Sequence, residues 1–128
     1  MQEAIISFDK ALEFKPDWYE AWKYRGITLR KLERFPEAIA SFHKAITIKS
    51  DDYADWNNQG YILLKLRHFE EAIASFDKAL ELKPDYADAF YNKACCYALQ
   101  GDIELAIDNL QKVLNLSYDQ YLKMAKND

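Results

Sequence analysis

Three serine–lysine pairs are the residues of this sequence whose type and spacing first point to chemistry. Each reads Ser-x-x-Lys, a motif in which a lysine stands beside a serine nucleophile for acyl transfer, and the serines are Ser7, Ser41 and Ser75. The copies are 34 residues apart, and a nucleophile would not be repeated three times without its partner residues. We therefore interpret the pairs as features of a structural repeat, at helix positions that lean towards the surface.

The other reactive side chains do not gather into a catalytic or metal-binding pattern. His43 and His68 have no second ligand at a useful spacing, so both are expected to be solvated. Cys95 and Cys96 are adjacent, and a disulfide between neighbours is strained. We interpret them as reduced thiols of one helix, with a redox switch as the alternative. The sequence therefore predicts no enzymatic activity, no bound metal and no cofactor.

The composition indicates one folded domain with a real core. Of the 128 residues, 50% are hydrophobic and 15% are aromatic, which argues against disorder. The net charge is −4 with both signs interspersed, so no general affinity for nucleic acid is expected. No apolar run approaches the ~18 residues of a membrane span, and no secretory leader opens the chain. We therefore expect a cytoplasmic protein that binds neither nucleic acid nor membrane.

One stretch recurs along the chain and sets its organisation. EAIASFDKALELKPD occupies 71–85, related stretches occupy 3–17 and 37–51, and a weaker copy occupies 105–119. A fixed period of 34 residues is typical of stacked repeats. The apolar residues follow the helical period of 3.6 throughout, so the repeats are expected to be helical.

The apolar pattern predicts a succession of helices joined by short loops, and short loops make neighbouring helices antiparallel. Pro16 and Pro84 end two of these helices, and Pro36 suits the first turn of another. The expected helices span 2–14, 18–31, 36–48, 52–65, 70–82, 86–99 and 102–116, and a last partial helix follows Ser117.

Two kinds of small or polar residue are expected to shape these helices. The residues predicted to cap helix starts are Asp17, Asp51 or Asp52, Asp85 and Asp102. Gly26 and Gly60 occupy the same place in consecutive repeats, and a missing side chain lets a partner helix approach closely.

In this pattern the chain resembles the tetratricopeptide repeat family, whose 34-residue unit is a pair of helices. The best-matching copy has Trp56, Gly60, Leu63, Ala72, Phe76, Ala79 and Pro84 at the family positions. The resemblance implies an all-α fold: a right-handed superhelix, or α-solenoid, of antiparallel helix pairs. It implies one array over 1–128, divided into a half repeat at 2–17, repeats at 18–51 and 52–85, a drifted repeat at 86–117, and the start of a capping or next-repeat helix at 118–128.

Two kinds of position depart from the family pattern. Arg25 and Gln59 stand where a leucine usually precedes the glycine, and Ser50 and Tyr118 stand where a proline usually ends a unit. These departures bear on function and leave the expected fold unchanged.

The resemblance also implies a binding groove, because the first helix of each pair lines the concave face of such arrays. Amides and phenols on that face suit an extended peptide, and its excess of basic residues favours an acidic or carboxylate-bearing one. We expect a protein-binding scaffold whose peptide ligand points its negative end towards Lys23 and Lys65. The predicted peptide-binding residues are Lys23, Tyr24, Ile27, Arg30, Asn57, Asn58, Tyr61, Lys65, Tyr91, Asn92 and Cys95.

The two ends of the array leave a second function open. Ile5, Phe8 and Leu12 belong to a helix whose partner helix is absent, so part of their apolar face is expected to be exposed. The alternative is therefore a structural or self-assembly module, which homo-oligomerises through this N-terminal helix or forms part of a longer repeat protein.

Overall fold

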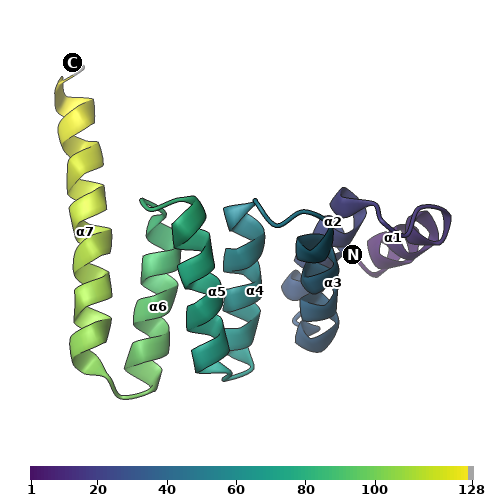
Figure 1. Ribbon diagram of the computed structural model, residues 1–128, viewed down its shortest axis with the longest axis horizontal. Coiled ribbons are helices and arrows are strands. Elements are labelled where there is room, and N and C mark those ends of the chain that lie inside the picture. The colour runs from purple at the N-terminus through teal and green to yellow at the C-terminus, as the bar shows by residue number, and fades with distance from the viewer. Residues whose placement is uncertain (127–128) are drawn as a thin grey trace.

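The computed structural model describes residues 1–126, which contain seven α-helices and no strand. The helices are α1 (Gln2–Phe14), α2 (Tyr19–Lys31), α3 (Phe35–Ile48), α4 (Tyr53–Lys65), α5 (Phe69–Leu82), α6 (Ala87–Leu99) and α7 (Ile103–Lys126). Figure 1 shows them following one another in a row, with α1 at one end and α7 at the other. The predicted all-α repeat fold is confirmed.

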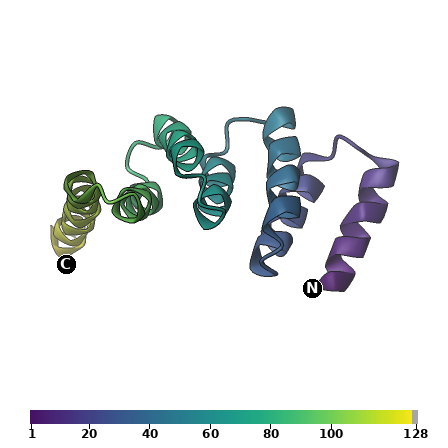
Figure 2. The same ribbon diagram turned by 90° about the horizontal axis from the view of Figure 1, so that it is seen from below.

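The helices pack as consecutive pairs. α2 packs on α3, α4 on α5 and α6 on α7, while α3 with α4 and α5 with α6 join one pair to the next, and α1 packs on α2. The row bends into an arc in the view of Figure 2, where α4 and α6 lie on the same side of α5. The first helices of the pairs therefore share one side of the array. The further division into repeat units stays a prediction.

The turn inside each pair has the same backbone geometry. Glu33, Arg67 and Gly101 adopt φ values of 59°, 63° and 84° in the three turns. In the first turn the N–H of Arg34 donates to the carbonyl of Leu29 at 2.9 Å, and the equivalent bond recurs at 2.8 Å in each of the other two. This is a Schellman motif, which reverses the chain in very few residues. Only the third turn uses glycine for the left-handed position.

The expected helix caps are partly confirmed. Asp52 caps α4, since its Oδ1 accepts a hydrogen bond from the N–H of Ala54 at 2.9 Å. Asp102 likewise accepts from the N–H of Leu105 at 3.2 Å. The expectation for Asp17 and Asp85 was wrong: α2 and α6 begin one residue later, after Trp18 and Tyr86, without a side-chain cap.

Phenylalanine side chains fill the space between the two helices of a pair, and tryptophan side chains fix the loops that precede the pairs. Phe42 and Phe76 are fully buried, and each lies against the glycine of the preceding helix, as expected. The indole N–H of Trp56 donates to the carbonyl of Ser50 at 2.8 Å. One repeat earlier, the indole N–H of Trp22 in α2 donates to the carbonyl of Pro16. This bond fixes the loop between α1 and α2 to α2.

The serines of the Ser-x-x-Lys pairs are not all at the surface. Ser41 and Ser75 are buried, which contradicts the expected surface position. Arg25 Nη1 donates to Ser41 Oγ at 2.6 Å, and Gln59 Nε2 lies 3.4 Å from Ser75 Oγ. Arg25 and Gln59, which replace the usual leucine of the family pattern, therefore give each buried hydroxyl a polar partner. A leucine at either position would leave the hydroxyl without one.

The expected apolar exposure of the N-terminal helix was wrong. Ile5 is 3% exposed and Leu12 is 9% exposed, and Phe8 is half-buried. Ile5 joins a core cluster with Leu29 of α2 and Phe42 of α3. The face that was expected to need a second molecule is therefore largely covered within the chain, because α1 packs on the following pair.

The expected break after Leu116 was also wrong. α7 runs without interruption from Ile103 to Lys126. Tyr118 occupies the place where Pro84 ends the corresponding helix α5, and a tyrosine keeps the N–H that a helix interior needs. The expected separate segment at 118–128 is thus the continuation of α7, and its last residues, 127 and 128, lie outside the described part of the chain.

Candidate functional site

Two adjoining hollows lie between α4 and α6. The first has a volume of about 350 Å³ and is lined by Arg30, Asn57, Asn58, Tyr61, Tyr86, Asp88, Tyr91 and Asn92. The second has about 500 Å³ and is lined by Tyr61, Leu64, Lys65, Arg67, Tyr91, Asn92, Cys95 and Leu99. Because they share Tyr61, Tyr91 and Asn92, the two hollows form one groove along the face that the first helices present.

Eight of the eleven predicted peptide-binding residues line this groove. They come from three helices: Arg30 from α2; Asn57, Asn58, Tyr61 and Lys65 from α4; Tyr91, Asn92 and Cys95 from α6. Helix periodicity places them together, because residues three, four and seven apart face the same way on one helix. We call this set the groove residues.

Amide side chains connect the two walls of the groove. Asn92 Nδ2 donates to Asn57 Oδ1 at 3.2 Å, and Asn57 Nδ2 donates to the Tyr86 hydroxyl at 3.4 Å. Burial and the nearby charge of Asp88 raise the pKa of Tyr86 to about 12, so the phenol stays neutral at physiological pH. The wall is therefore polar at this point, with further donors and acceptors free for a peptide backbone.

Basic side chains gather around Tyr61. The guanidinium of Arg30 lies 5.5 Å from the centre of the Tyr61 ring, and Lys65 Nζ lies 5.4 Å from the same centre. Within residues 1–126 the Arg30 Nε is buried and has no hydrogen-bond partner. Arg30, Lys65 and Arg67 stand against the single acidic residue Asp88 in the lining. The groove therefore offers positive charge to an anionic group.

Lys23 does not belong to the groove, which corrects the predicted orientation of the ligand. Its Nζ lies 2.7 Å from Asp52 Oδ2 and 3.8 Å from Asp55 Oδ1, so two carboxylates of α4 and its cap already neutralise it. Burial lowers the pKa of Lys23, but the hydrogen bond to Asp52 and both carboxylate charges outweigh this and raise it overall. Lys23 joins α2 to α4 and is not available to a ligand in the groove.

Tyr24 and Ile27 are also outside the groove. Tyr24 lines a separate apolar hollow of about 370 Å³ with Phe8 of α1 and Trp18. Ile27 packs against the core cluster that contains Leu29 and Phe42. The peptide-binding residues were predicted from the periodicity of each helix by itself. The packing of α1 and α3 on α2 decides which α2 side chains remain accessible to a ligand.

A buried polar cluster forms beside Lys23. The Tyr19 hydroxyl donates a hydrogen bond to Asp55, which is fully buried. The same hydroxyl lies 3.1 Å from Asp52 Oδ2. Burial raises the pKa of the Asp55 carboxyl, and the hydrogen bond from Tyr19 only partly opposes this. Burial and the hydrogen bond to Asp55 also hold the pKa of Tyr19 far above its usual range. The cluster joins α2 to α4, and its residues are not part of the groove lining.

Five groove-lining residues are absent from the predicted set. Leu64, Asp88 and Leu99 lie on the same helix faces as the predicted residues, whereas Tyr86 and Arg67 lie at helix ends. Tyr86 stands directly before α6, so helix periodicity does not place it on the groove face. Arg67 lies in the turn after α4 at positive φ, and it lines the second hollow from there. Neither position carries a signal in helix periodicity, since one precedes a helix and the other follows one.

Comparison with protein families decides the class of the chain. A family model described as "Tetratricopeptide repeat" matches residues 57–120, and a second with the same description matches residues 19–52. The chain belongs to the tetratricopeptide repeat family. Its members serve as protein-interaction scaffolds, and the seven helices in residues 1–126 have the paired arrangement of tetratricopeptide units.

Solved structures of tetratricopeptide type share this fold. A crystal structure of MamA is 23% identical with a TM-score of 0.85, covering 88% of this chain and 66% of that one. Residues 41 to the end of MamA from Desulfovibrio magneticus RS-1 are 22% identical with a TM-score of 0.89, covering 93% and 67%. At this identity the likeness concerns the fold alone, and the chain spans about two thirds of the length of these structures. No curated protein matches the chain.

Two further properties of the described residues bear on the class of site. Between residues 1 and 126 no helix is both long enough and apolar enough to cross a membrane. In the same range, no three His, Cys, Asp or Glu side chains are placed so as to hold a metal ion.

Proposed function

We propose that this tetratricopeptide chain is a non-enzymatic scaffold that binds an extended peptide segment of a partner protein in the groove between α4 and α6. The observation that carries the proposal is the basic excess of the groove lining, in which Arg30, Lys65 and Arg67 stand against the single acidic residue Asp88. A carboxylate on a ligand would pair with these basic side chains. The ligand segment therefore bears a carboxylate, either an acidic side chain or a chain terminus.

The groove residues divide the work of recognition. Asn58 and Asn92 present amides that pair with the peptide backbone, and Tyr61 and Tyr91 offer ring faces to its side chains. The carboxylate lies beside Arg30 and Lys65, both of which stand close to Tyr61, rather than beside Lys23. Ordering a flexible peptide offsets much of the contact free energy, so the affinity is on the order of micromolar.

The test uses short extended peptides labelled with a fluorophore, one rich in glutamate with a free carboxyl terminus and one with glutamine and an amidated terminus. Fluorescence anisotropy measures their affinity for the natural chain and for the double variant Arg30→Gln with Asn58→Ala. We expect the acidic peptide to bind to the natural chain. The double variant should raise the dissociation constant of that peptide by about tenfold or more, a loss of ~1.4 kcal/mol in binding free energy. Added salt should weaken binding as well, because it screens exposed charges.

Lys44→Ala is the matched control, because Lys44 is an exposed lysine of α3 that lines none of the groove. It should leave the affinity unchanged. Equal binding of the acidic and neutral peptides would overturn the role of Arg30. Equal binding of the acidic peptide by the natural chain and the double variant would overturn the groove assignment.

A further inference from the structure

The two walls of the second hollow differ in chemistry. Apart from the residues that it shares with the first hollow, its lining consists of Leu64, Lys65 and Arg67 from α4 and the turn after it, and of Cys95 and Leu99 from α6. Lys65 and Leu99 occupy the same place in consecutive repeats, since they are 34 residues apart. The same helix position is therefore basic on the α4 wall and apolar on the α6 wall.

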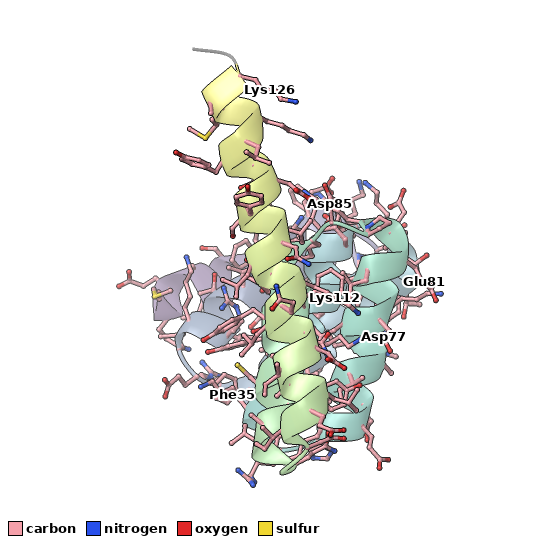
Figure 3. The ribbon with its side chains drawn as sticks, turned by 90° about the vertical axis from the view of Figure 1, so that its left-hand side faces the viewer. Phe35, Asp77, Glu81, Asp85, Lys112 and Lys126 are labelled. Atoms are coloured by element: carbon pink, nitrogen blue, oxygen red, sulfur yellow. The ribbon has the colours of Figure 1, made fainter. Side chains whose placement is uncertain are left out.

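The apolar surface of the α6 wall is open to a ligand. Leu99 is 54% exposed, and Cys95 beside it is half-buried. None of the described residues of α7 lines the hollow, and Figure 3 shows α7 at the end of the array, where it extends past the other helices. An apolar side chain of a ligand that covers Leu99 would remove apolar surface from water on both partners, which favours binding.

An extended peptide fits two unlike walls. Successive side chains of an extended chain point to opposite sides. A peptide that runs along the groove between α4 and α6 therefore turns one side chain towards Lys65 and the next towards Leu99. Charge complementarity selects a carboxylate for the first position, because among the described residues no acidic side chain lines the second hollow. Apolar burial selects an apolar side chain for the second position.

We propose that the peptide recognised by this groove carries an acidic residue directly beside an apolar residue of about the size of leucine. The carboxylate lies next to Lys65, and the apolar side chain lies against Cys95 and Leu99. This inference rests on the proposed function, since it names the class of peptide that the groove binds. Lys65 contributes affinity for any acidic peptide, whereas Leu99 determines which acidic peptides are preferred.

Three fluorophore-labelled peptides test the proposal on the full chain. The first is rich in glutamate and has one central leucine between two glutamates. The second has serine in place of that leucine. The third contains the same residues as the first but places a serine on each side of the leucine. Fluorescence anisotropy should show the first peptide binding about fivefold or more tighter than either of the others, because it alone combines the leucine contact with a neighbouring carboxylate.

A matched pair of variants locates the leucine contact. Leu99 is the last residue of α6 and is 54% exposed, so Leu99→Ser should fold, and circular dichroism should show unchanged helix content. Leu99→Ser should reduce the preference for the first peptide over the second to about twofold or less. Leu82→Ser is the control: Leu82 is the last residue of α5, is 41% exposed and lines neither hollow, so the preference should persist. Lys65→Gln should weaken the first two peptides by similar factors.

The outcomes separate this inference from the proposed function. Equal affinity of the first and second peptides for the natural chain overturns the inference and leaves the acidic-peptide groove standing. A preference that survives Leu99→Ser, or that Leu82→Ser abolishes, overturns it too, because the leucine then binds elsewhere. Equal affinity of the first and third peptides overturns the requirement for adjacent residues. If none of the three peptides binds up to about 1 mM, the proposed function fails and the inference fails with it.

Discussion

The Gly60 backbone lies directly against the Phe76 ring. A Cβ atom added at Gly60 would stand 2.5 Å from Cε1 of Phe76, closer than real Cβ contacts. One repeat earlier, a Cβ at Gly26 would stand 2.9 Å from Cδ2 of Phe42. Glycine is thus required because a buried phenylalanine from the second helix of the pair occupies the space of the side chain.

The first prediction concerns this contact. Gly60→Ala should destabilise the protein by about 1–3 kcal/mol, the usual cost of overpacking, although alanine favours the helix itself. Gly26→Ala should cost less, because its ring is further away. Urea unfolding measures both. In a Phe76→Leu background the cost of Gly60→Ala should shrink, and an equal cost in both backgrounds would show that the ring is not responsible.

The second prediction concerns the turn between α2 and α3. Glu33 adopts a φ of 59°, which is strained for any residue with a Cβ, and its side chain is exposed. Glu33→Gly should therefore stabilise the protein by about 0.5–1 kcal/mol. Lys31→Gly, at the last residue of α2, should instead destabilise the protein, because Lys31 is not at positive φ and glycine is the poorer helix former. Thermal unfolding of the two variants checks the direction of both stability changes. A lower stability of Glu33→Gly would contradict the backbone strain assigned to Glu33.

The third prediction concerns pH. Burial raises the pKa of Asp52, but hydrogen bonds from Lys23 and from the N–H of Ala54 outweigh it and hold the pKa below its usual 3.8. Asp52 therefore adds stability above pH 3.8, and this is lost as the pH falls through its lower folded value. The substitution Asp52→Asn keeps the size of the side chain and its capping oxygen but removes the charge. The stability advantage of the natural chain over this variant should thus shrink on acidification, as measured by urea unfolding at several pH values.

Asp55 supplies the opposite sign and serves as the control for that experiment. Its pKa is raised by burial, so the folded state favours the protonated carboxyl, and its contribution to stability falls as the pH rises above 3.8. As the pH rises, the stability of Asp55→Asn relative to the natural chain should increase, whereas that of Asp52→Asn should decrease. Identical trends for the two variants would contradict the assignment of the charges.

The fourth prediction concerns the two cysteines. Cys96 is buried, and burial raises the pKa of its thiol to about 11, whereas Cys95 is half-buried and lines the groove. Only thiolates react readily, so a thiol reagent at neutral pH should modify Cys95 in the folded chain and Cys96 only on unfolding. Mass spectrometry of the labelled peptides locates the adduct. Equal rates at both residues in the folded chain would contradict the burial of Cys96.

Modification of Cys95 also links the thiol to the groove. An adduct there should weaken binding of the acidic peptide described above, because it fills the second hollow. Cys95→Ser should bind the peptide and resist the reagent, which separates the effect of the adduct from that of losing the thiol.

The sequence by itself determined the helices, their antiparallel pairing and most of the core. Helix periodicity is a local property, and the 34-residue repeat shows the same inward positions several times over. This is why Gly60 and Phe76 could be assigned to the core, and why Asn58, Tyr61 and Asn92 could be assigned to one face. The exceptions, such as Tyr86 and Arg67, lie at helix ends where that periodicity does not reach.

The tertiary structure decided which of these residues are free to act. Lys23 and Arg30 lie on the same helix and look alike in the sequence. Lys23 is nevertheless neutralised by Asp52 at the start of α4, whereas Arg30 lines the groove. Likewise, the apolar face of α1 is covered and that of α7 is bare. Periodicity fixes the direction of a side chain on its own helix, but the offset between neighbouring helices fixes what that side chain meets.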